Sequence, residues 1–586
     1  MKRLASLWLI LLVLGTFAIA RAAERPNVVI FLADDSGWGD YSFAGNTDLR
    51  TPNIDSIARG GAVLDRFYVC SVCAPTRAEF LTGRYHSRGG VRGVSTGQER
   101  LNADEKTLAD AFKAAGYATG AFGKWHNGSQ WPYHPNARGF DEYYGFTSGH
   151  WGEYFDPPLE HNGRPVRGRG FIANDFTTRA IEFIDRNRAK PFLCYVPFNT
   201  PHSPWAVPEE YWRRFKDKPL AMRATDAGKE RLDETRCALA MMENLDDNVG
   251  RVLKRLEELK LAENTIVLYF SDNGPNEWRW NGGMKGIKGS TDEGGVRSVF
   301  FIRWSAGGIR PGTVVREITG AIDLLPTLAT LTGVKRVGDK PLDGRDLSPL
   351  LLGKAAAWSD RLLFSHQNGN VSARSQRYRL DHRGALFDMV ADPSQTKDIA
   401  EEKPDVTSQM AAAVATWRAE VLPRSKDERA FPVGYAEFPR SPLPARDGVP
   451  RGGVKRSAGA PNCSYFVNWT NVHDRMTWDI EVKTTGNYDV EILYTCPLAD
   501  VGSTIELEFN SAKFSGQVAP GWDPPLYRNQ DTIPRPRVES QMKEFRPLNL
   551  GVMRLERGRG LLTLRALTIA RQNVMDVRQI NLTLRN

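Results

Sequence analysis

The feature that most constrains the fold is a recurrent unit in which a short apolar run ends in charged or polar residues. The segments "NVVIFLADD", "YATGAFGKWH", "AKPFLCYVPFNTPH" and "NTIVLYFSDN" follow this pattern, and helix-like stretches precede the second and the fourth. Buried parallel strands that alternate with amphipathic helices have this signature. The sequence therefore predicts an α/β domain with a doubly wound, mostly parallel sheet.

Two of these runs end in acidic or amide side chains, Asp34 and Asp35 in the first and Asp272 and Asn273 in the fourth. Ligands of open α/β sheets bind at the carboxyl ends of the strands, so we expect the four side chains to meet there. One Asp after a strand is more often a turn or helix cap, but two such pairs favour a metal site. All-oxygen ligands suit Ca²⁺, with Mg²⁺ as the alternative, and not zinc.

Further charged residues stand in motifs around these strand ends: Arg77, Lys124, His126, His202 and Lys288. Arginine and lysine beside a dication form a pocket for an oxyanion, and histidines supply an acid and a base near neutral pH. Each of these residues alone is more simply a surface charge or a hydrogen-bonded histidine. Their clustering in motifs favours a chemical role.

The chain has six cysteines, too few for a disulfide scaffold. The pair Cys70 and Cys73 has the spacing of a redox motif, which remains an alternative, but no second close pair completes a four-thiolate zinc site.

Residues 1–22 combine a basic start, an apolar core and small residues before the expected cleavage point, so we interpret them as a signal peptide of a secreted or periplasmic protein. The apolar core is short for a membrane span, and we expect no stable membrane insertion.

The formal net charge is +9, but charges of both signs are mixed along the chain. Without a basic block that contains aromatic residues, we expect no nucleic-acid partner.

A chain of 586 residues is too long for one core. We expect a catalytic domain over 23–345, a small C-terminal α+β subdomain over 346–425, a Pro/Gly-rich linker over 426–455 and an appended β-sandwich over 456–586. The sandwich is either a carbohydrate-binding module or a passive cap. Trp469, Trp478 and Trp522 could stack on sugars or fill its core.

The segment Cys73-Ala-Pro75-Thr76-Arg77, followed by Leu81-Thr82-Gly83-Arg84, resembles the signature of the type I, formylglycine-dependent sulfatases, the arylsulfatase-like members of the alkaline phosphatase superfamily. The motifs "FLADDSGWGD", "GKWH", "TPHSP", "FSDNG" and "KGSTDEGGVR" also match, in the family's order, and the likeness runs from about Arg25 to about Val406. Asn127 and Ser298 depart from the family pattern without replacing a residue expected in the chemistry.

This resemblance implies the alkaline phosphatase-like sulfatase fold and a sulfuric ester hydrolase. It implies that a formylglycine-generating enzyme or an anaerobic sulfatase-maturating enzyme converts Cys73 to Cα-formylglycine, whose hydrated aldehyde attacks sulfur. The implied metal ligands are Asp34, Asp35, residue 73, Asp272 and Asn273, and the implied catalytic residues are Cys73, Arg77, Lys124, His126, His202 and Lys288.

We therefore expect hydrolysis of sulfate monoesters, with a sulfated carbohydrate as the substrate. A phosphodiesterase or phosphonate monoester hydrolase with the same machinery is the first alternative, and an inactive glycan-binding protein is the second. The loops that select the sugar are expected at 147–164 and 365–368, where aromatic and hydrogen-bonding side chains are frequent.

Overall fold

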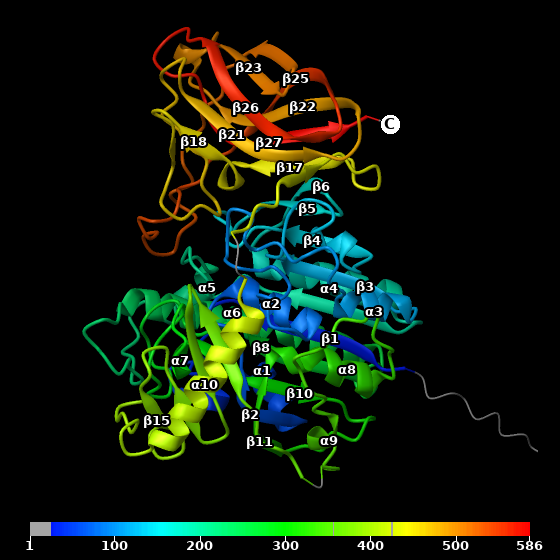
Figure 1. Ribbon diagram of the computed structural model, residues 1–586, viewed down its shortest axis with the longest axis vertical. Helices are drawn as coiled ribbons and strands as arrows, with labels where there is room; N and C mark the ends of the chain where they lie inside the picture. The colour runs from blue at the N-terminus through cyan, green and yellow to red at the C-terminus, as the bar shows by residue number, and fades with distance from the viewer. Residues whose placement is uncertain (1–24, 356, 424–425, 586) are drawn as a thin grey trace, which may run out of the picture.

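The computed structural model describes residues 25–355, 357–423 and 426–585, so the predicted signal peptide lies outside the described residues. A large α/β domain and a β-sandwich lie one above the other along the longest axis (Figure 1). Among the helices of the described ranges, none has the length and apolar character that crossing a bilayer requires.

The α/β domain is built on one large sheet whose central strands are parallel, as predicted. β1 pairs in parallel with β7 and β8, β3 pairs in parallel with β7 and β4, and β10 is antiparallel to both neighbours. In spatial order the strands are β11 (Thr313–Gly320), β2 (Ala62–Tyr68), β10 (Phe300–Arg303), β8 (Thr265–Ser271), β1 (Asn27–Ala33), β7 (Phe192–Pro197), β3 (Ala118–Lys124), β4 (Glu142–Phe146), β5 (Pro158–His161) and β6 (Arg164–Arg167), with β9 (Arg297–Ser298) beside β2.

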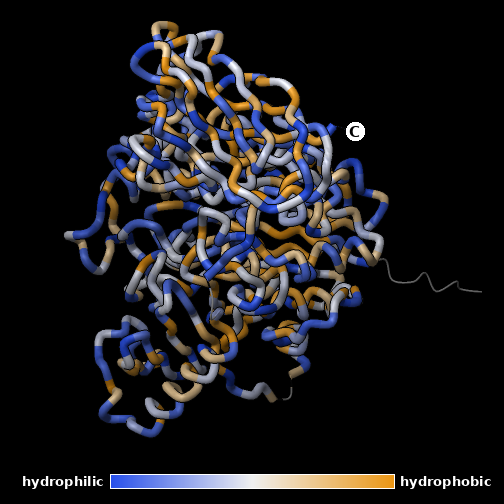
Figure 2. Tube along the Cα trace, turned by 45° about the horizontal axis from the view of Figure 1, so that its top comes forward, coloured by the Kyte–Doolittle hydropathy of each residue, from blue (hydrophilic) through white to orange (hydrophobic). Residues whose placement is uncertain are grey.

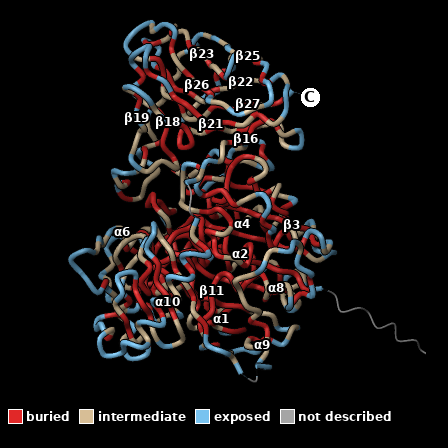
Figure 3. Tube along the Cα trace, viewed as in Figure 1, coloured by how far each residue is buried: buried red, intermediate tan, exposed pale blue. Residues whose placement is uncertain are grey.

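Helices cover both faces of this sheet, which confirms the doubly wound architecture. Successive residues of β1 alternate between two hydrophobic cores, as the strand period requires. One core includes α1 (Pro52–Arg59), α4 (Ile172–Asn187) and α6 (Leu232–Glu258), and the other includes α2 (Cys73–Thr82), α3 (Leu108–Ala114) and α8 (Leu324–Thr332). The short helices are α5 (Glu209–Trp212), α7 (Glu293–Val296) and α9 (Ser348–Leu351). Buried residues, drawn in red, fill the centre of the domain (Figure 3).

A small α+β unit follows within the range 346–425. It contains the antiparallel strands β12 (Leu363–Gln367), β13 (Asn370–Arg374), β14 (Tyr378–Leu380) and β15 (Leu386–Asp388), and the helix α10 (Pro404–Val421). Trp417 and Val421 of α10 pack in one buried cluster with Val371 of β13 and Tyr68 of β2. Ile318 of the edge strand β11 belongs to the same cluster, so the unit is attached to this edge of the large sheet through apolar side chains.

The C-terminal part is a β-sandwich of two sheets around one core. One sheet contains β16 (Phe431–Val433), β21 (Arg475–Val482), β26 (Gly558–Thr568), β23 (Thr504–Phe509), β24 (Ala512–Gln517) and β18 (Val449–Arg451). The other contains β19 (Lys455–Arg456), β20 (Phe466–Val467), β27 (Asp576–Leu584), β22 (Gly486–Thr495), β25 (Arg546–Leu555) and β17 (Arg440–Pro444). Buried residues alternate with more exposed ones along β22 and β23, and hydrophilic and hydrophobic stretches are mixed along the chain (Figure 2).

The prediction of a linker over 426–455 is wrong. β16 pairs with β21, β17 with β27 and β18 with β21, so these residues are integral strands of the sandwich. The high Pro and Gly content marks edge strands and tight turns instead. Trp469 and Trp478 are each 1% exposed in the sandwich core, so they are packing residues and cannot stack on sugars.

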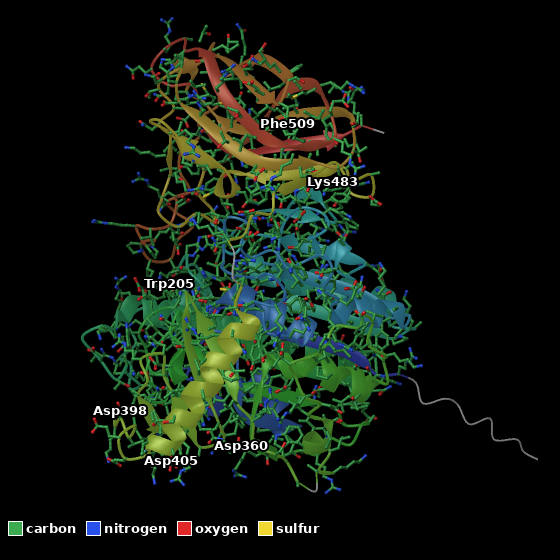
Figure 4. The ribbon with its side chains drawn as sticks, viewed as in Figure 1. Trp205, Asp360, Asp398, Asp405, Lys483 and Phe509 are labelled. Atoms are coloured by element: carbon green, nitrogen blue, oxygen red, sulfur yellow. The ribbon has the colours of Figure 1, made fainter. Side chains whose placement is uncertain are left out.

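The sandwich lies directly on the α/β domain. Arg446 donates a hydrogen bond to Ser129, Gln130 donates to the Pro442 carbonyl at 2.8 Å, and Arg100 donates to the Ala430 carbonyl at 2.8 Å. Trp205, labelled in Figure 4, lies at the side of the α/β domain that faces the sandwich. The two domains therefore share a specific polar interface.

Candidate active site

The polar strand ends meet at one edge of the large sheet, as predicted. Asp34 and Asp35 follow β1, His202 follows β7, Asp272 and Asn273 follow β8, and Lys124 is the last residue of β3. Asp35 donates a backbone hydrogen bond to Asp272 Oδ1 at 3.2 Å, which connects the ends of β1 and β8 directly. Because β8, β1, β7 and β3 are consecutive neighbours in the sheet, four motifs that are distant in sequence lie together in one site.

Buried oxygen atoms form the centre of the site. Ligand atoms of Asp34, Asp35, Asp272 and Cys73 all lie within 4.8 Å of one another. The Asn273 amide nitrogen donates to Asp35 Oδ1 at 2.8 Å, while Asn273 Oδ1 and Asp34 Oδ1 are buried without a hydrogen-bond partner among the described residues. Unpaired buried acceptors are costly, and a hard cation would satisfy both.

The carboxyl groups carry opposed pKa shifts. Burial pushes the pKa of Asp34 upward, but the charges of Lys124 and Arg77 outweigh burial and hold that pKa well below its usual range. Burial and the nearby Asp34 charge raise the pKa of Asp272 to about 7, although Arg77 opposes the rise. A cation in the cluster would keep all three carboxyl groups ionised, because it adds positive charge where the anions are concentrated.

Cys73 is the first residue of α2 and is 2% exposed. Its sulfur lies 3.9 Å from Asp35 Oδ1, and burial raises the pKa of the thiol, although Lys124 and Lys288 oppose the rise. Thr76, in the first turn of α2, accepts a hydrogen bond from the Cys70 backbone and donates to the Asp272 carbonyl at 2.6 Å. These bonds fix the start of α2 against the end of β8. All six cysteines are free, so Cys70 and Cys73 form no disulfide.

Two fully buried cations, Arg77 and Lys124, contact the carboxylates. Arg77 donates to Asp272 Oδ2 through Nε and Nη2 at 3.2 and 2.8 Å, and to the Lys124 carbonyl at 2.7 Å. Lys124 Nζ donates to Asp34 Oδ2 at 2.6 Å. Both side chains are fully buried, so their orientation is set by these hydrogen bonds.

Lys288, the third cation, is on the loop between β8 and α7. Its ammonium group lies 2.7 Å from both oxygens of Asp35, and its side chain is 21% exposed. The loop is attached to the segment before Cys73, because the Gly289 backbone donates to the Ser71 carbonyl at 2.8 Å. Lys288 is therefore the most exposed of the three cations around the cluster.

The two histidines present different ring nitrogens. His202 Nδ1 lies 2.5 Å from the Ser203 carbonyl and must donate to it, so Nε2 is the free nitrogen and faces Asp35 Oδ2 at 3.5 Å. His126 instead donates through Nε2 to the Val94 carbonyl at 2.8 Å, and its Nδ1 is buried without a partner among the described residues. Burial lowers the pKa of His202 to about 4 and that of His126 well below its usual range, so both rings are neutral at pH 7.

Backbone conformation at the site is unusual. Asp35 has a φ of 69° and His126 a φ of 67°, in the left-handed region that residues other than glycine seldom occupy. Gly149 is required beside His126, because a Cβ there would lie 2.1 Å from His126 Nε2. Strained residues of this kind persist where the surroundings hold them, often at active sites.

Several residues of the site were not predicted. Arg279 pairs with Asp40 at 2.7 Å and donates to the Asp35 carbonyl at 2.9 Å, which fixes the turn after β1. Asn127 donates to the Ala74 carbonyl at 3.1 Å, next to Cys73. Asp40 lies in the motif "GWGD", but nothing in the sequence connects it to Arg279.

The loops expected to select the sugar lie partly in the protein core. Tyr154 is 2% exposed and donates to backbone carbonyls, and Trp151 stacks on Phe146. His366, on β12 of the small α+β unit, stacks on His86, which follows α2 in the α/β domain. Tyr154 contacts the site through the His202 carbonyl, and the ring of His150 lies 5.1 Å from the ring of His202.

Comparison with known proteins agrees with this geometry. A family model described as Sulfatase matches residues 26–334. N-acetylgalactosamine-6-sulfatase of Mus musculus is 33% identical over 404 residues, which cover 63% of this chain and 73% of that protein. Steryl-sulfatase of Rattus norvegicus is 31% identical over 470 residues, which cover 63% of this chain and 78% of that protein.

Solved structures show the same relationship. The crystal structure of Ps i-CgsB in complex with k-i-k-neocarrahexaose superposes with a TM-score of 0.62 at 28% identity and covers 69% of this chain and 95% of that chain. A phosphonate monoester hydrolase of Agrobacterium radiobacter, with a TM-score of 0.52 and 21% identity, covers 68% of this chain and 96% of that chain and shares the fold alone. The chain belongs to the sulfatase family and is an enzyme that hydrolyses sulfate esters.

Proposed function

We propose that this enzyme removes sulfate from a sulfated carbohydrate, using residue 73 as formylglycine and a bound divalent cation, with Ca²⁺ as the first candidate and Mg²⁺ as the second. The observation that carries the proposal is the convergence of Cys73, an all-oxygen cluster and three cationic side chains within one buried site. Sulfate is a tetrahedral oxyanion, and positive charge placed around its oxygen atoms stabilises the transition state of its transfer.

The proposed cation ligands are Asp34, Asp35, residue 73, Asp272 and Asn273. The unpartnered Asp34 Oδ1 and Asn273 Oδ1 support this assignment, as does the raised pKa of Asp272, which a cation would lower. A cation bound by these residues supplies Lewis-acid stabilisation of the nucleophile and of the sulfate oxygens.

The buried thiol of Cys73 is a poor nucleophile, because burial disfavours the thiolate. As formylglycine, residue 73 supplies a hydrated aldehyde, with one hydroxyl group for attack on sulfur and a second for expelling sulfate. Its place at the start of α2 suits this role, since a helix N-terminus favours developing negative charge.

Three cations are proposed to bind the sulfate oxygens: Arg77, Lys124 and Lys288. Arg77 is held by Asp272 and by the Lys124 carbonyl, so its planar donors are preorganised before substrate arrives. Lys124 and Lys288 each contact one carboxylate, Asp34 and Asp35 respectively. With a cation bound to those carboxylates, both ammonium groups can instead donate to sulfate.

Two proton transfers are assigned to the histidines. His202 has its free Nε2 directed into the site, and the negative charge of the substrate favours its protonation there, so it is placed to protonate the departing alcohol oxygen. His126 carries its proton on Nε2, which leaves Nδ1 as an unprotonated and unpartnered base. It is assigned to remove the proton from the second hydroxyl group of residue 73.

A carbohydrate substrate is supported by two of the proteins compared above. N-acetylgalactosamine-6-sulfatase acts, by its name, on a sulfated amino sugar, and the Ps i-CgsB structure contains a neocarrahexaose.

We also propose export, to the periplasm or outside the cell, and maturation by a formylglycine-generating or anaerobic sulfatase-maturating enzyme. The N-terminal residues 1–22 and the Cys73-Ala-Pro75-Thr76-Arg77 motif support these two assignments.

Sulfate release from a panel of sulfated monosaccharides, sulfated glycans and 4-nitrophenyl sulfate tests the proposal, with phosphodiesters and phosphonate monoesters assayed in parallel. The expected result is turnover of at least one sugar sulfate, with loss of all activity in Cys73→Ala. Faster hydrolysis of a phosphodiester or phosphonate ester than of every sulfate ester would contradict the proposal.

A further inference from the structure

The connection between β24 and β25, residues 518–545, leaves the sandwich and lies against the α/β domain (Figure 1). The Thr532 backbone donates to the Trp205 carbonyl at 2.8 Å, and the Val207 backbone donates to Thr532 Oγ1 at 2.9 Å. Arg535 donates to the Gly152 carbonyl at 2.8 Å. This segment of the sandwich is therefore fixed beside the loop that carries His150 and beside the segment that follows His202.

Glu539 of this connection reaches the candidate active site. Ser203 Oγ donates to Glu539 Oε1, and Glu539 Oε2 lies 3.5 Å from His150 Nε2. One ligand-type atom each from His150, His202 and Glu539 lies within 4.8 Å of the others. A residue more than 330 positions away in sequence from His202 therefore contributes to the leaving-group side of the site.

Two of these atoms are unsatisfied. Neither His150 Nε2 nor Glu539 Oε2 has a hydrogen-bond partner among the described residues, and both side chains are less than one-tenth exposed. Their 3.5 Å separation is too long for a good hydrogen bond between them. Buried polar atoms normally find partners, so a buried carboxylate oxygen and a buried imidazole nitrogen this close together indicate a ligand group that contacts both.

The sandwich also fixes the position of this pair. Cys463 of the sandwich donates through its sulfur to the His150 carbonyl at 2.8 Å. Arg535 is held by Asp531 at 2.7 Å and donates to the Ser540 carbonyl at 2.6 Å, next to Glu539. Because both partners are anchored before substrate binds, the pair can discriminate between groups of different hydrogen-bonding capacity.

We propose that Glu539 and His150 bind a free hydroxyl group next to the sulfated carbon of the sugar, so that the sandwich supplies part of the substrate pocket. A hydroxyl group can donate to Glu539 Oε2 and accept from His150 Nε2 at the same time. The inference rests on the proposed function, since His202 then faces the departing ester oxygen and the neighbouring hydroxyl group faces the pair. Glu539 lies outside the residues matched by the sulfatase family model, whereas His150 and His202 lie inside them.

The test compares Glu539→Gln with the wild-type enzyme on three substrates: the best sugar sulfate of the panel, its analogue that lacks the neighbouring hydroxyl group, and 4-nitrophenyl sulfate. Glu544→Gln is the matched control, because Glu544 is exposed on the same connection. Melting temperatures show whether each variant keeps its fold.

For the sugar sulfate, Glu539→Gln should lower kcat/KM by about tenfold or more, because a buried hydrogen bond to the substrate is lost. Turnover of 4-nitrophenyl sulfate should change by less than about twofold, since that substrate has no neighbouring hydroxyl group. With the wild-type enzyme, kcat/KM for the deoxy analogue should be lower than for the sugar sulfate by a similar factor. Glu539→Gln should cause no further decrease in kcat/KM for the analogue, because in a double-mutant cycle the same hydrogen bond cannot be lost twice. Glu544→Gln should have the kcat/KM of the wild-type enzyme on all three substrates.

Equal losses on the sugar sulfate and on 4-nitrophenyl sulfate, or no loss on either, would overturn this inference while leaving sulfate hydrolysis intact. Stoichiometric binding of added zinc to metal-stripped wild-type protein, abolished in Glu539→Gln, would also overturn it, because two histidines and a carboxylate are zinc ligands. Absence of sulfate release from every substrate by converted wild-type enzyme would contradict the proposed function itself, and this inference with it.

Discussion

Arg578 on β27 of the sandwich donates hydrogen bonds to both carboxylate oxygens of Glu153 in the α/β domain, at 2.8 and 3.4 Å. The side chains are 15% and 2% exposed, and the Arg578 guanidinium also lies 5.4 Å from the centre of the Trp151 ring. Glu153 is in the loop that carries His150. The conformation of this active-site loop therefore depends on a charge from the other domain.

Replacement of Arg578 by Met should leave Glu153 as an uncompensated buried charge. Breaking a buried pair by removing one partner costs about 3–5 kcal/mol, so we expect a loss of that order in the free energy of unfolding. The double variant Arg578→Met with Glu153→Leu should recover most of the loss, because both charges are then absent. Urea denaturation followed by tryptophan fluorescence measures both effects.

The exposed pair Arg585 and Asp489 is the control for this experiment, since both side chains are about half exposed. Arg585→Met should change the free energy of unfolding by less than about 1 kcal/mol. If Arg578→Met and Arg585→Met behaved alike, the interface pair would have no special role.

Removal of divalent cations should inactivate the enzyme. The proposed ligands are hard oxygen donors, so Ca²⁺ should restore turnover of 4-nitrophenyl sulfate better than Zn²⁺ after chelation, with Mg²⁺ as the comparison. Elemental analysis before and after chelation gives the metal content. Full activity in protein that has been shown to contain no metal would refute the assignment of the oxygen cluster.

The geometry of Arg77 should matter more than its charge. Lysine at this position keeps a positive charge but cannot form the two bonds to Asp272 and the bond to the Lys124 carbonyl together. We expect Arg77→Lys to lower kcat/KM by about 10²–10³-fold, the effect of losing one preorganised donor to the transition state. Steady-state kinetics with 4-nitrophenyl sulfate measures this, and activity within twofold of wild type, on the scale of a surface substitution, would be inconsistent with the assigned role.

Acid should destabilise the fold through buried histidines outside the candidate active site. His86 and His366 stack with ring centroids 5.6 Å apart. Burial lowers the pKa of His86 to about 4 and that of His366 to about 3, from 6.5 in the unfolded chain. The unfolded chain therefore binds more protons below pH 6.5, and stability that is present at pH 7 is lost as the pH falls towards 4.

His366→Gln should reduce this loss, because it removes one of the two titrating rings. Melting temperatures at pH 7 and pH 5 should differ less in the variant than in the wild-type protein. An unchanged difference would show that the stacked pair does not contribute to the acid sensitivity.

Much of the site could be predicted from local sequence. Asp34, Asp35, Asp272 and Asn273 follow apolar strands, and parallel strands bring their carboxyl ends to one edge of a sheet. The position of each of these residues in the fold can therefore be predicted from the few residues that precede it. The match of several motifs in one order then indicated the family.

The contribution of the sandwich could not be predicted in this way. Glu539 lies in an irregular connection, where no periodic pattern fixes position, and its neighbours His150 and Ser203 are brought to it only by domain packing. The linker prediction failed for a related reason. Pro and Gly mark both flexible chain and edge strands, and β16, β17 and β18 are defined by partners that follow in sequence.

The role of residue 73 as formylglycine is tested most directly by relating its chemical conversion to turnover. Preparations made with and without a maturating enzyme would be digested, and mass spectrometry of the peptide containing residue 73 would give the fraction in which an aldehyde replaces the thiol. We expect kcat per enzyme molecule for sulfate release to be proportional to this fraction and to extrapolate to zero without conversion. Full sulfate release by protein that retains the Cys73 thiol would contradict it.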